Sequence, residues 1–440
     1  MSRKRKLKSK IYEIEIESLS HEGRGISHND NKVIFTRGAL PGEKVIASRT
    51  LSRAKFEEAD VVEILKPSPD RIEAKCEVYG ICGGCSFQHL SSENQIAAKQ
   101  NWLQSAFMGQ AKAEPKNWLP PMQVQSWGYR RKARLGVRYV PKKEKVLVGF
   151  RERKSSFITV MSRCEVLHPS LGDNLEVLAN YIGRLSIREH VPQIEAAIAE
   201  SDTILILRHL QPLTTSDELI LKECGDKLSI TWYTQSGGLD TIKPLIEAVT
   251  LTYSIPDHRI KMEFLPSDFT QVNFAVNQKM VDLAIELLEL NEQDNVIDLF
   301  CGLGNFTLPI SRYVKQIVGI EGDNGLIERA KANADANGIT NASFYKADLS
   351  EDVSGSEWFR GQKYNKALID PARTGAIEIV ELLPKLNIER LVYVSCNPAT
   401  LARDTARLIE LGFTLMSAGV MDMFPQTAHV ESIALFTRKK

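Results

Sequence analysis

The chain has 440 residues, of which 43% are hydrophobic and 25% charged, and a formal net charge of +1. This length predicts two or three domains with substantial hydrophobic cores. The sequence contains no apolar run as long as a membrane span, and no apolar signal region follows the charged N-terminus, so we expect a cytoplasmic protein that is not exported. Seven scattered cysteines argue against a secreted disulfide framework and favour reduced thiols.

The small net charge hides an uneven distribution of charged residues. Residues 1–66 carry 14 Lys and Arg against 10 Asp and Glu, whereas residues 271–440 carry 17 against 22. One basic cluster lies at residues 3–10, and a longer basic stretch runs from Tyr129 to Lys154. Basic clusters are often only solvated surface, but they also suit a phosphate backbone. The second stretch predicts contact with RNA, with Tyr129 and Tyr139 available to stack on bases.

The first 66 residues form a series of short apolar runs separated by glycine turns. Residues 10–20 alternate apolar and acidic side chains, and further runs follow at 32–35, 41–46 and 59–65. This spacing predicts a small β-barrel. Its Gly23-Arg-Gly25 and Leu40-Pro-Gly-Glu43 segments resemble those of the TRAM domain, an OB-like RNA-binding module of RNA-modifying enzymes. The resemblance implies that residues 1–66 form a TRAM-like barrel that binds RNA.

Three cysteines follow within ten residues. Cys76, Cys82 and Cys85 have the spacing C-x5-C-x2-C, and the two glycines between the last pair let the backbone fold tightly around one centre. Cys164 lies far downstream, after a predicted strand at 157–161, and could supply a fourth thiolate. Four thiolates suit either zinc or an iron–sulfur cluster, and the spacing alone does not separate the two.

Residues 70–265 are expected to form a central α/β or α+β domain that shapes an RNA cleft. The pattern predicts a helix at 91–107, a β-hairpin with a positive face at 128–164, a helix at 171–185, and strands at 203–208 and 228–234. No motif in this part indicates a chemical function.

From residue 266 the pattern changes to a regular alternation of strands and helices, which begins with an amphipathic helix after Asn273. Strands are predicted at 295–300, 316–321, 342–347, 366–369, 391–394, 413–417 and 433–437, and helices at 306–314 and 326–336. This alternation predicts a doubly wound parallel sheet in residues 266–440.

A glycine turn joins the first of these strands to its helix. Gly302 and Gly304 permit a close approach of the backbone to a ligand. A nicotinamide-binding site has a third glycine at the spacing of position 307, where this chain has Thr. A more compact nucleoside ligand such as S-adenosylmethionine (SAM) therefore fits better. Glu321 ends the second strand, where an acid can hold ribose hydroxyls, and Asp348 closes the third, where an acid can contact adenine.

The strands that follow carry further polar residues at their ends. Asp370 begins an Asp-Pro-Ala-Arg-Thr-Gly segment after the fourth strand, Cys396 ends the fifth, and His429-Val-Glu431 precedes the last. Open α/β sheets bind ligands at the carboxyl ends of their strands, so this position alone suits Cys396 equally as a nucleophile or as a buried core thiol, and the other motifs of the domain favour the nucleophile. Taken alone, Glu431 would be a surface acid and His429 a hydrogen-bonded structural residue.

Together these motifs resemble the RNA uracil-C5 methyltransferase family, whose catalytic domain is a class I SAM-dependent methyltransferase. Only a bacterial 23S rRNA branch of that family carries both a TRAM domain and a four-cysteine 4Fe-4S cluster. The resemblance therefore implies C5 methylation of a uridine of 23S rRNA, with a 4Fe-4S cluster on Cys76, Cys82, Cys85 and Cys164. It also implies that the SAM and uracil sites are lined by Gln271, Phe300, Gly302, Asn305, Glu321, Asp348 and Asp370. Ala372 replaces a second proline of some relatives, which affects no catalytic group.

This chemistry gives Cys396 and Glu431 separate roles. C5 of uracil is a poor nucleophile, but a thiolate that adds to C6 turns the ring into an enolate whose C5 can attack the SAM methyl. The proton on C5 must then leave before the thiol is eliminated, and a carboxylate can take it. We therefore predict Cys396 as nucleophile and Glu431 as general base, acting on a uracil that has left its stack and is held at its edge by Asp370.

Several alternatives stay open at this point. The nearest is methylation of another rRNA or tRNA uridine. A cytosine-C5 methyltransferase would need a Pro-Cys or two-cysteine context and an acid for N3, which are not seen, and Thr307 disfavours a nicotinamide oxidoreductase. A non-catalytic RNA-binding iron–sulfur protein would leave Cys396 and Glu431 without a role. We expect a monomer with no obligate protein partner and no contact with a membrane.

Overall fold

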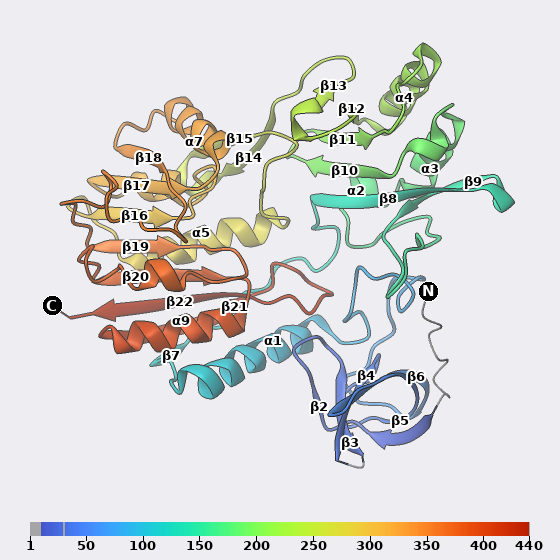
Figure 1. Ribbon diagram of the computed structural model, residues 1–440, viewed down its shortest axis with the longest axis horizontal. Coiled ribbons are helices and arrows are strands. Elements are labelled where there is room, and N and C mark those ends of the chain that lie inside the picture. The colour runs from blue at the N-terminus through green and yellow to red at the C-terminus, as the bar shows by residue number, and fades with distance from the viewer. Residues whose placement is uncertain (1–9, 30, 440) are drawn as a thin grey trace.

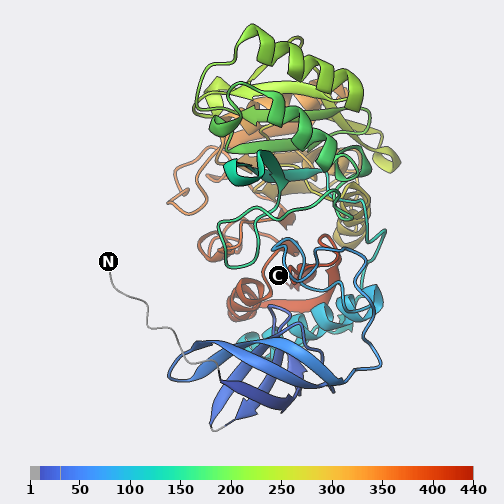
Figure 2. The ribbon, with the colours of Figure 1, turned by 90° about the vertical axis from the view of Figure 1, so that its right-hand side faces the viewer.

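The computed structural model describes residues 10–29 and 31–439, which form four β-sheets (Figure 1). Of the basic cluster at residues 3–10, all but Lys10 lies outside the described residues. Figure 2 shows the N-terminal sheet at one end of the molecule and the central sheet at the other. Every helix within the described residues is too short or too polar to cross a membrane.

The N-terminal sheet has six strands that curl around a small apolar core. They are β1 (Ile11–Glu15), β2 (Ser18–Leu19), β3 (Gly25–Asn29), β4 (Lys32–Arg37), β5 (Lys44–Ser52) and β6 (Phe56–Lys66), in the order β1-β5-β6-β4-β3-β2. The burial of every second residue in β1 follows from its alternating sequence. Because β1 and β2 are consecutive in the chain but lie at opposite edges, the sheet bends back on itself.

The Leu-Pro-Gly-Glu segment fixes the exit from this sheet. The buried Glu43 carboxylate accepts hydrogen bonds from the N–H groups of Leu40 (2.8 Å) and Ser68 (3.2 Å) and from Nε of Arg71 (2.5 Å). Burial alone would raise the pKa of Glu43, but these three donors bring it below its ordinary value. The carboxylate thereby ties the sheet to the cysteine-bearing segment that follows.

The chain next forms α1 (Ser92–Ala106), a π-helical turn η1 (Phe107–Ala111) and the short strand β7 (Asn117–Trp118). Ser91 caps α1 by accepting a hydrogen bond from the N–H of Asn94 at 3.3 Å. α1 packs against strand β21 (Phe413–Met421), and β7 pairs with the same strand. This part of the 70–265 segment therefore lies against the C-terminal sheet (Figure 1).

The central sheet is also six-stranded, in the order β13-β12-β11-β10-β8-β9. Its strands are β8 (Lys132–Val140), β9 (Lys145–Gly149), β10 (Gln193–Ile198), β11 (Thr203–Arg208), β12 (Thr231–Gln235) and β13 (Lys243–Pro244). The helices of this part are α2 (Pro169–Gly172), α3 (Leu175–Arg184) and α4 (Thr215–Leu228), with single 3-10 turns η2 (Pro141–Lys143), η3 (Arg188–His190) and η4 (Leu239–Thr241). A hairpin of β14 (Leu251–Ile255) and β15 (Ile260–Phe264), joined by turn η5 (Pro256–His258), leads to the C-terminal part.

The first residues of the long basic stretch are structural, which corrects one expectation. Tyr129 is buried and its hydroxyl donates to the carbonyl of Pro425 (2.9 Å), so it is not available to stack on a base. Lys132 donates to the carbonyls of Pro266 (3.0 Å) and Asp268. The prediction for Tyr129 was wrong because its charged neighbours suggested a surface, whereas the segment that leads into β8 enters the core.

The C-terminal sheet has eight strands in the order β18-β17-β16-β19-β20-β22-β21-β7. Besides β7 and β21 they are β16 (Asn295–Leu299), β17 (Gln316–Glu321), β18 (Ala342–Lys346), β19 (Lys366–Ile369), β20 (Arg390–Ser395) and β22 (Glu431–Arg438). Its helices are α5 (Phe274–Leu288), α6 (Thr307–Ser311), α7 (Asn324–Ala336), α8 (Ile377–Val380) and α9 (Pro398–Glu410).

This sheet is mixed and not wholly parallel, which is a second correction. The five strands β16 to β20 are parallel, but β22 runs antiparallel to both β20 and β21. The expectation of parallel strands failed here because residues 422–430 connect β21 directly to β22 as a hairpin, without a crossover helix. As a result, the start of β22 lies at the same edge as the ends of the parallel strands.

Candidate functional site

Three predicted functional groups meet at the edge where β19 and β20 end and β22 begins. Ser395, the last residue of β20, pairs with Ser432 of β22, so Cys396 and Glu431 lie beside this pair on neighbouring strands. Asp370 directly follows β19, whose last residue pairs in parallel with β20. The sequence predicted these side chains at strand ends, and the register of the sheet brings them together.

The environment raises the pKa of each of these three groups. Burial, with the nearby Asp370 carboxylate, raises the pKa of Glu431 well above its ordinary range, and Arg373 only partly opposes this. Burial raises the pKa of Asp370 to about 7. The pKa of the half-buried Cys396 thiol rises to about 11, because of burial and then of the carboxylates of Glu431 and Asp370, against the opposing charge of Arg373. All three groups therefore bind their protons more tightly than the same groups do in water.

Glu431 is only 4% exposed, so the expectation that it is a surface acid, from its sequence context alone, is wrong. A buried carboxylate with a raised pKa has a higher affinity for a proton, which is the property of a general base. No local pattern indicates this burial, because Glu431 is the first residue of an antiparallel strand and is buried only by the pairing of that strand.

The Asp370-Pro-Ala-Arg-Thr-Gly loop is held by the helix that follows Cys396. The carboxylate of Asp404 in α9 accepts hydrogen bonds from the N–H of Ala376 (2.8 Å) and the hydroxyl of Tyr393 (2.6 Å). Gly375 has a φ of 80°, and an added Cβ there would lie 2.7 Å from the Asp404 carboxylate. Glycine is required at this position by both the backbone conformation and the close contact.

Arg373 connects this loop to two other segments. Its carbonyl accepts hydrogen bonds from the side chains of Asn397 (3.1 Å) and Thr400 (3.3 Å), which flank the start of α9. Its guanidinium Nη2 lies 3.2 Å from Nδ1 of His429. His429 is thus hydrogen-bonded, as expected, and it packs edge-on against Phe424.

The glycine turn lies at the end of the neighbouring strand β16. Phe300, Gly302 and Gly304 all have positive φ values (69°, 56° and 96°), and a Cβ added at Gly302 would meet no atom within 4 Å. Glu321 accepts a hydrogen bond from the N–H of Gly302 at 3.0 Å. Thr307, which replaces a third glycine, donates through its hydroxyl to Asp298 at 2.5 Å and so fastens α6 to β16.

The other residues predicted to contact SAM lie around this turn. The amide of Asn305 exchanges two hydrogen bonds of 2.9 Å with Asn277 in α5 and also accepts one from the hydroxyl of Tyr253. Asp348 is exposed beyond the end of β18 and accepts hydrogen bonds from Ser350. Gln271 is half-buried just before α5. The side chains of Asn305 and Asp348 therefore already form hydrogen bonds within the protein.

The four predicted metal-binding cysteines surround one cavity of about 230 Å3. Cys82 and Cys164 are buried and Cys76 and Cys85 half-buried, and none forms a disulfide. Burial raises the pKa of Cys85 to about 12, because the thiol is desolvated and its donor neighbours do not compensate. Within residues 10–29 and 31–439, no group of three or more His, Cys, Asp and Glu side chains is arranged to hold a metal ion. His429, which belongs to the loop that leads to Glu431, also lines the cavity.

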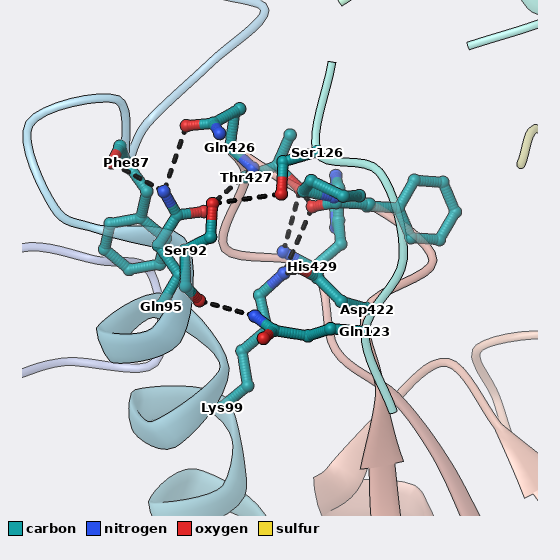
Figure 3. Close-up of polar contacts among 12 residues, drawn as sticks. Phe87, Ser92, Gln95, Lys99, Gln123, Ser126, Asp422, Gln426, Thr427 and His429 are labelled. Atoms are coloured by element: carbon teal, nitrogen blue, oxygen red, sulfur yellow. Dashed lines mark hydrogen bonds and ion pairs between the residues drawn. The ribbon is translucent and has the colours of Figure 1, made fainter. Parts of the chain in front are cut away.

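Sequence reasoning missed a polar cluster beside this cavity (Figure 3). Nζ of Lys99 lies 2.6 Å from Oδ1 of Asp422, and the two side chains are 0% and 2% exposed. One signal was present: Lys99 has the helical spacing of the buried residues Ile96 and Leu103, so it falls on the apolar face of α1. A lysine at such a position needs a buried partner, but the sequence did not indicate which acid supplies it.

Comparisons with known proteins agree with this architecture. Residues 240–439 match the family model for tRNA (Uracil-5-)-methyltransferase, and residues 5–62 match that for the TRAM domain. The chain is 68% identical over 439 residues to the 23S rRNA (uracil(1939)-C(5))-methyltransferase RlmD of Vesicomyosocius okutanii, covering 100% of both chains. It is 48% identical to the RlmD protein of Francisella tularensis subsp. novicida, covering 98% of both chains, and 46% identical to that of Stenotrophomonas maltophilia, covering 97% of both.

Among solved structures, the chain resembles the Pyrococcus abyssi tRNA (uracil-54, C5)-methyltransferase in complex with S-adenosyl-L-homocysteine. The TM-score is 0.75 at 20% sequence identity, with 97% of this chain and 100% of that chain covered. At this identity the match supports the fold alone, and it confirms the expected methyltransferase α/β fold.

Proposed function

The chain belongs to the 23S rRNA (uracil-C5)-methyltransferase family of RlmD proteins, and we propose that it methylates C5 of uracil 1939 in 23S rRNA with SAM as the methyl donor. Its catalytic domain resembles an enzyme that acts on a tRNA uridine, so another RNA uridine is the alternative substrate. The observation that carries the proposal is the convergence of Cys396, Glu431 and Asp370 at one edge of the sheet, next to the glycine turn.

In the proposed mechanism Cys396 acts as the nucleophile. Its thiolate forms a bond to C6 of uracil, and the electron pair of the C5–C6 double bond moves toward C5 and the ring carbonyl. SAM supplies an electrophilic methyl group, and the new C5–methyl bond forms as S-adenosylhomocysteine departs. The positive charge of Arg373 lowers the pKa of the thiol, so it favours the reactive thiolate.

Glu431 acts in the second half of the reaction. Its carboxylate takes the proton from C5, the C5–H electron pair restores the double bond to C6, and the Cys396 sulfur leaves as a thiolate. The raised pKa of Glu431 suits this proton transfer. Asp370, whose pKa of about 7 lets it hold a proton, can both donate to and accept from the edge of the uracil ring.

The glycine turn fits the methyl donor. The open space beside Gly302 and the Glu321 carboxylate at the end of β17 suit a nucleoside whose ribose hydroxyls need an acceptor. We assign Gln271, Phe300, Asn305, Asp348 and Asp370 as further contacts. Because Asn305 and Asp348 already bind protein groups, they must exchange partners or use remaining lone pairs when the donor binds.

We propose a 4Fe-4S cluster for the four-cysteine cavity. Four thiolates on one zinc ion at about 2.3 Å would have to lie roughly 3.8 Å apart. The four thiols line one cavity of about 230 Å3, which leaves room for a centre larger than a single zinc ion, with one thiolate on each iron. Arg153 donates to the carbonyl of Cys82 at 3.0 Å, which helps to fix this segment.

The rRNA is expected to bind across the three proposed domains, at residues 1–66, 70–265 and 266–440. A groove of about 860 Å3 lies between the N-terminal barrel and the central sheet. Six cationic side chains line it: Arg24, Arg37, Arg134, Arg151, Arg153 and Lys154. Three acids, Glu22, Glu58 and Glu152, lie among them, so the balance is basic and suits a phosphate backbone. We propose a cytoplasmic monomer.

The mechanism is tested by two variants that fail at different steps. Cys396→Ala should bind RNA and SAM but form no covalent adduct, whereas Glu431→Gln should transfer the methyl and then retain the RNA. A denaturing gel with a short target RNA should show a slow, methylated species only for Glu431→Gln. Cys224→Ala, at a buried cysteine remote from the sheet edge, is the control. Normal turnover by Glu431→Gln, or an adduct without Cys396, would refute the assignment.

The cluster is tested by metal analysis of anaerobically purified protein. We expect a brown protein with about four iron atoms per chain, with iron lost in Cys164→Ser and retained in Cys224→Ser. A colourless protein with one tightly bound zinc would overturn the proposal for iron.

A further inference from the structure

The residues immediately before Glu431 form a loop, residues 422–430, that joins β21 to β22. The loop enters the sheet at Glu431, so its conformation sets where the carboxylate stands relative to Cys396. Figure 3 shows Gln95 and Lys99 projecting from α1 toward this loop. α1 itself contributes no side chain to the catalytic edge described above.

Lys99 holds the beginning of the loop. Its ammonium group donates to Oδ1 of Asp422 (2.6 Å) and to the carbonyl of Phe424 (3.1 Å), and its side chain is fully buried. Buried ion pairs contribute little net stability, since an apolar pair of similar volume is often as stable or more so. Unlike an apolar pair, this ion pair restricts the geometry of the loop. Nζ of Lys99 must stay within hydrogen-bonding distance of both Oδ1 of Asp422 and the carbonyl oxygen of Phe424.

Gln95 holds the middle of the loop. Its amide oxygen accepts from the N–H of Gln426 (2.9 Å), and its amide nitrogen donates to the Gln426 side-chain oxygen (3.0 Å). Gln426 has a φ of 68°, a backbone conformation that a non-glycine residue adopts only when its surroundings enforce it. Its carbonyl accepts from the N–H groups of Ser86 and Phe87, at 2.9 and 3.1 Å. The loop is therefore held on one side by α1 and by the segment that carries the cysteines.

We propose that Lys99 and Gln95 are positioning residues for the general base. They fix the 422–430 loop so that Glu431 enters β22 beside Cys396, and they touch neither the uracil nor SAM. This inference rests on the proposed role of Glu431. It assigns to α1 a specific step of the reaction, the loss of the C5 proton, and not the formation of the adduct.

The expected effect follows from how steeply proton transfer depends on geometry. A displacement of about 1 Å can cost on the order of 100-fold in rate. Cys396 is positioned by β20, α9 and the Asp370 loop, whereas the hydrogen bonds of Lys99 go to Asp422 and Phe424. Lys99→Met should therefore leave adduct formation within about twofold of the wild type and slow release of the methylated RNA at least tenfold.

Single-turnover reactions of the full-length holoenzyme with a short target RNA test this. Lys99→Met leaves Asp422 buried and unpaired, so the double variant Lys99→Met/Asp422→Leu is measured beside it, with Gln95→Met as a second, independent perturbation. Lys279→Met, at an exposed lysine of α5, is the control. We expect the double variant to recover the wild-type thermal midpoint to within a few degrees and still to accumulate the methylated adduct. Gln95→Met should accumulate the methylated adduct as well.

Three outcomes would overturn the inference. One is a double variant with wild-type thermal midpoint and wild-type adduct lifetime. Another is an equal slowing of adduct formation and release in Gln95→Met, which is the sign of a purely structural role. The third is loss of folding in both the double variant and Gln95→Met. If Glu431→Gln itself fails to accumulate adduct, the proposed function of Glu431 is wrong instead, so the two failures are distinguishable.

Discussion

Replacement of Asp404 by alanine should destabilise the protein strongly, although this residue contacts no substrate. Oδ2 of Asp404 accepts the hydroxyl proton of Tyr393, which is 0% exposed, and the N–H of Ala376, which is 2% exposed. In Asp404→Ala both buried donors lose their acceptor, and each such loss costs about 1–3 kcal/mol. The free energy of unfolding should therefore fall by about 2–6 kcal/mol.

The matched variant Asp404→Asn keeps an oxygen that can stand at the Oδ2 position. Both buried donors then retain an acceptor, and the new amide nitrogen replaces Oδ1, which accepts from the partly exposed Arg403 at 2.8 Å. The free energy of unfolding of Asp404→Asn should therefore be about 1 kcal/mol lower than that of the wild type, which is in the range of one ordinary hydrogen bond. Asp335→Ala, at an exposed residue of α7, should stay within about 0.5 kcal/mol of the wild type.

Urea unfolding followed by tryptophan fluorescence measures these differences, provided that the unfolding slope is the same for all variants. The rate of methylation should follow the same ranking, since Asp404 also holds the loop of Asp370 and Arg373. An Asp404→Ala variant as stable as Asp404→Asn would refute the reasoning, because it would mean that the two buried donors find other acceptors.

Three further predictions concern charge. The rate of adduct formation should rise about tenfold per pH unit between pH 7 and 9, because the pKa of Cys396 is about 11 and only the thiolate reacts; a flat profile in stopped-flow assays would contradict this. The pKa of Asp370 is raised to about 7, so the stability of the wild type should fall as the pH rises from about 4 to 7. The thermal midpoint of Asp370→Asn should rise relative to that of the wild type across this window. An equal difference between the two midpoints at pH 4 and pH 8 would argue against this prediction. Arg134→Ala and Arg151→Ala, in the basic groove, should each reduce the slope of log affinity against log salt by about 0.7–0.9 in RNA-binding titrations, whereas an unchanged slope would place the RNA elsewhere.

The sequence was most informative where local pattern and chemistry coincide. The parallel strands β16, β17, β19 and β20 are built around apolar runs, and Glu321, Asp370 and Cys396 stand at or directly after the ends of the last three. Since parallel strands all end at one edge, the position of each of these residues in the chain already predicts that they gather there. The distance in sequence between Asp370 and Cys396 does not matter to this argument.

The sequence was least informative where position depends on distant partners. Tyr129 lies among arginines and lysines, yet its ring is buried and its hydroxyl reaches Pro425, almost 300 residues away. Glu431 looked like a surface acid because only the pairing of β22 between β20 and β21 buries it. In both cases the local sequence is compatible with exposure, and tertiary packing decides otherwise.

The contacts of α1 also bear on whether the N-terminal parts are separable attachments to a methyltransferase. Trp102 near the end of α1 donates to the carbonyl of Leu19 in the barrel (3.4 Å) and stacks on Phe87, with ring centroids 5.7 Å apart. The N–H of Phe87 in turn binds the carbonyl of Gln426, five residues before Glu431. A continuous set of contacts thus joins the barrel and the cysteine segment to the loop before Glu431, the proposed general base. Removal of the cysteine segment would expose one side of the 422–430 loop, and removal of the barrel would expose Trp102 beneath it, so the effect of either on catalysis should exceed the loss of RNA affinity alone.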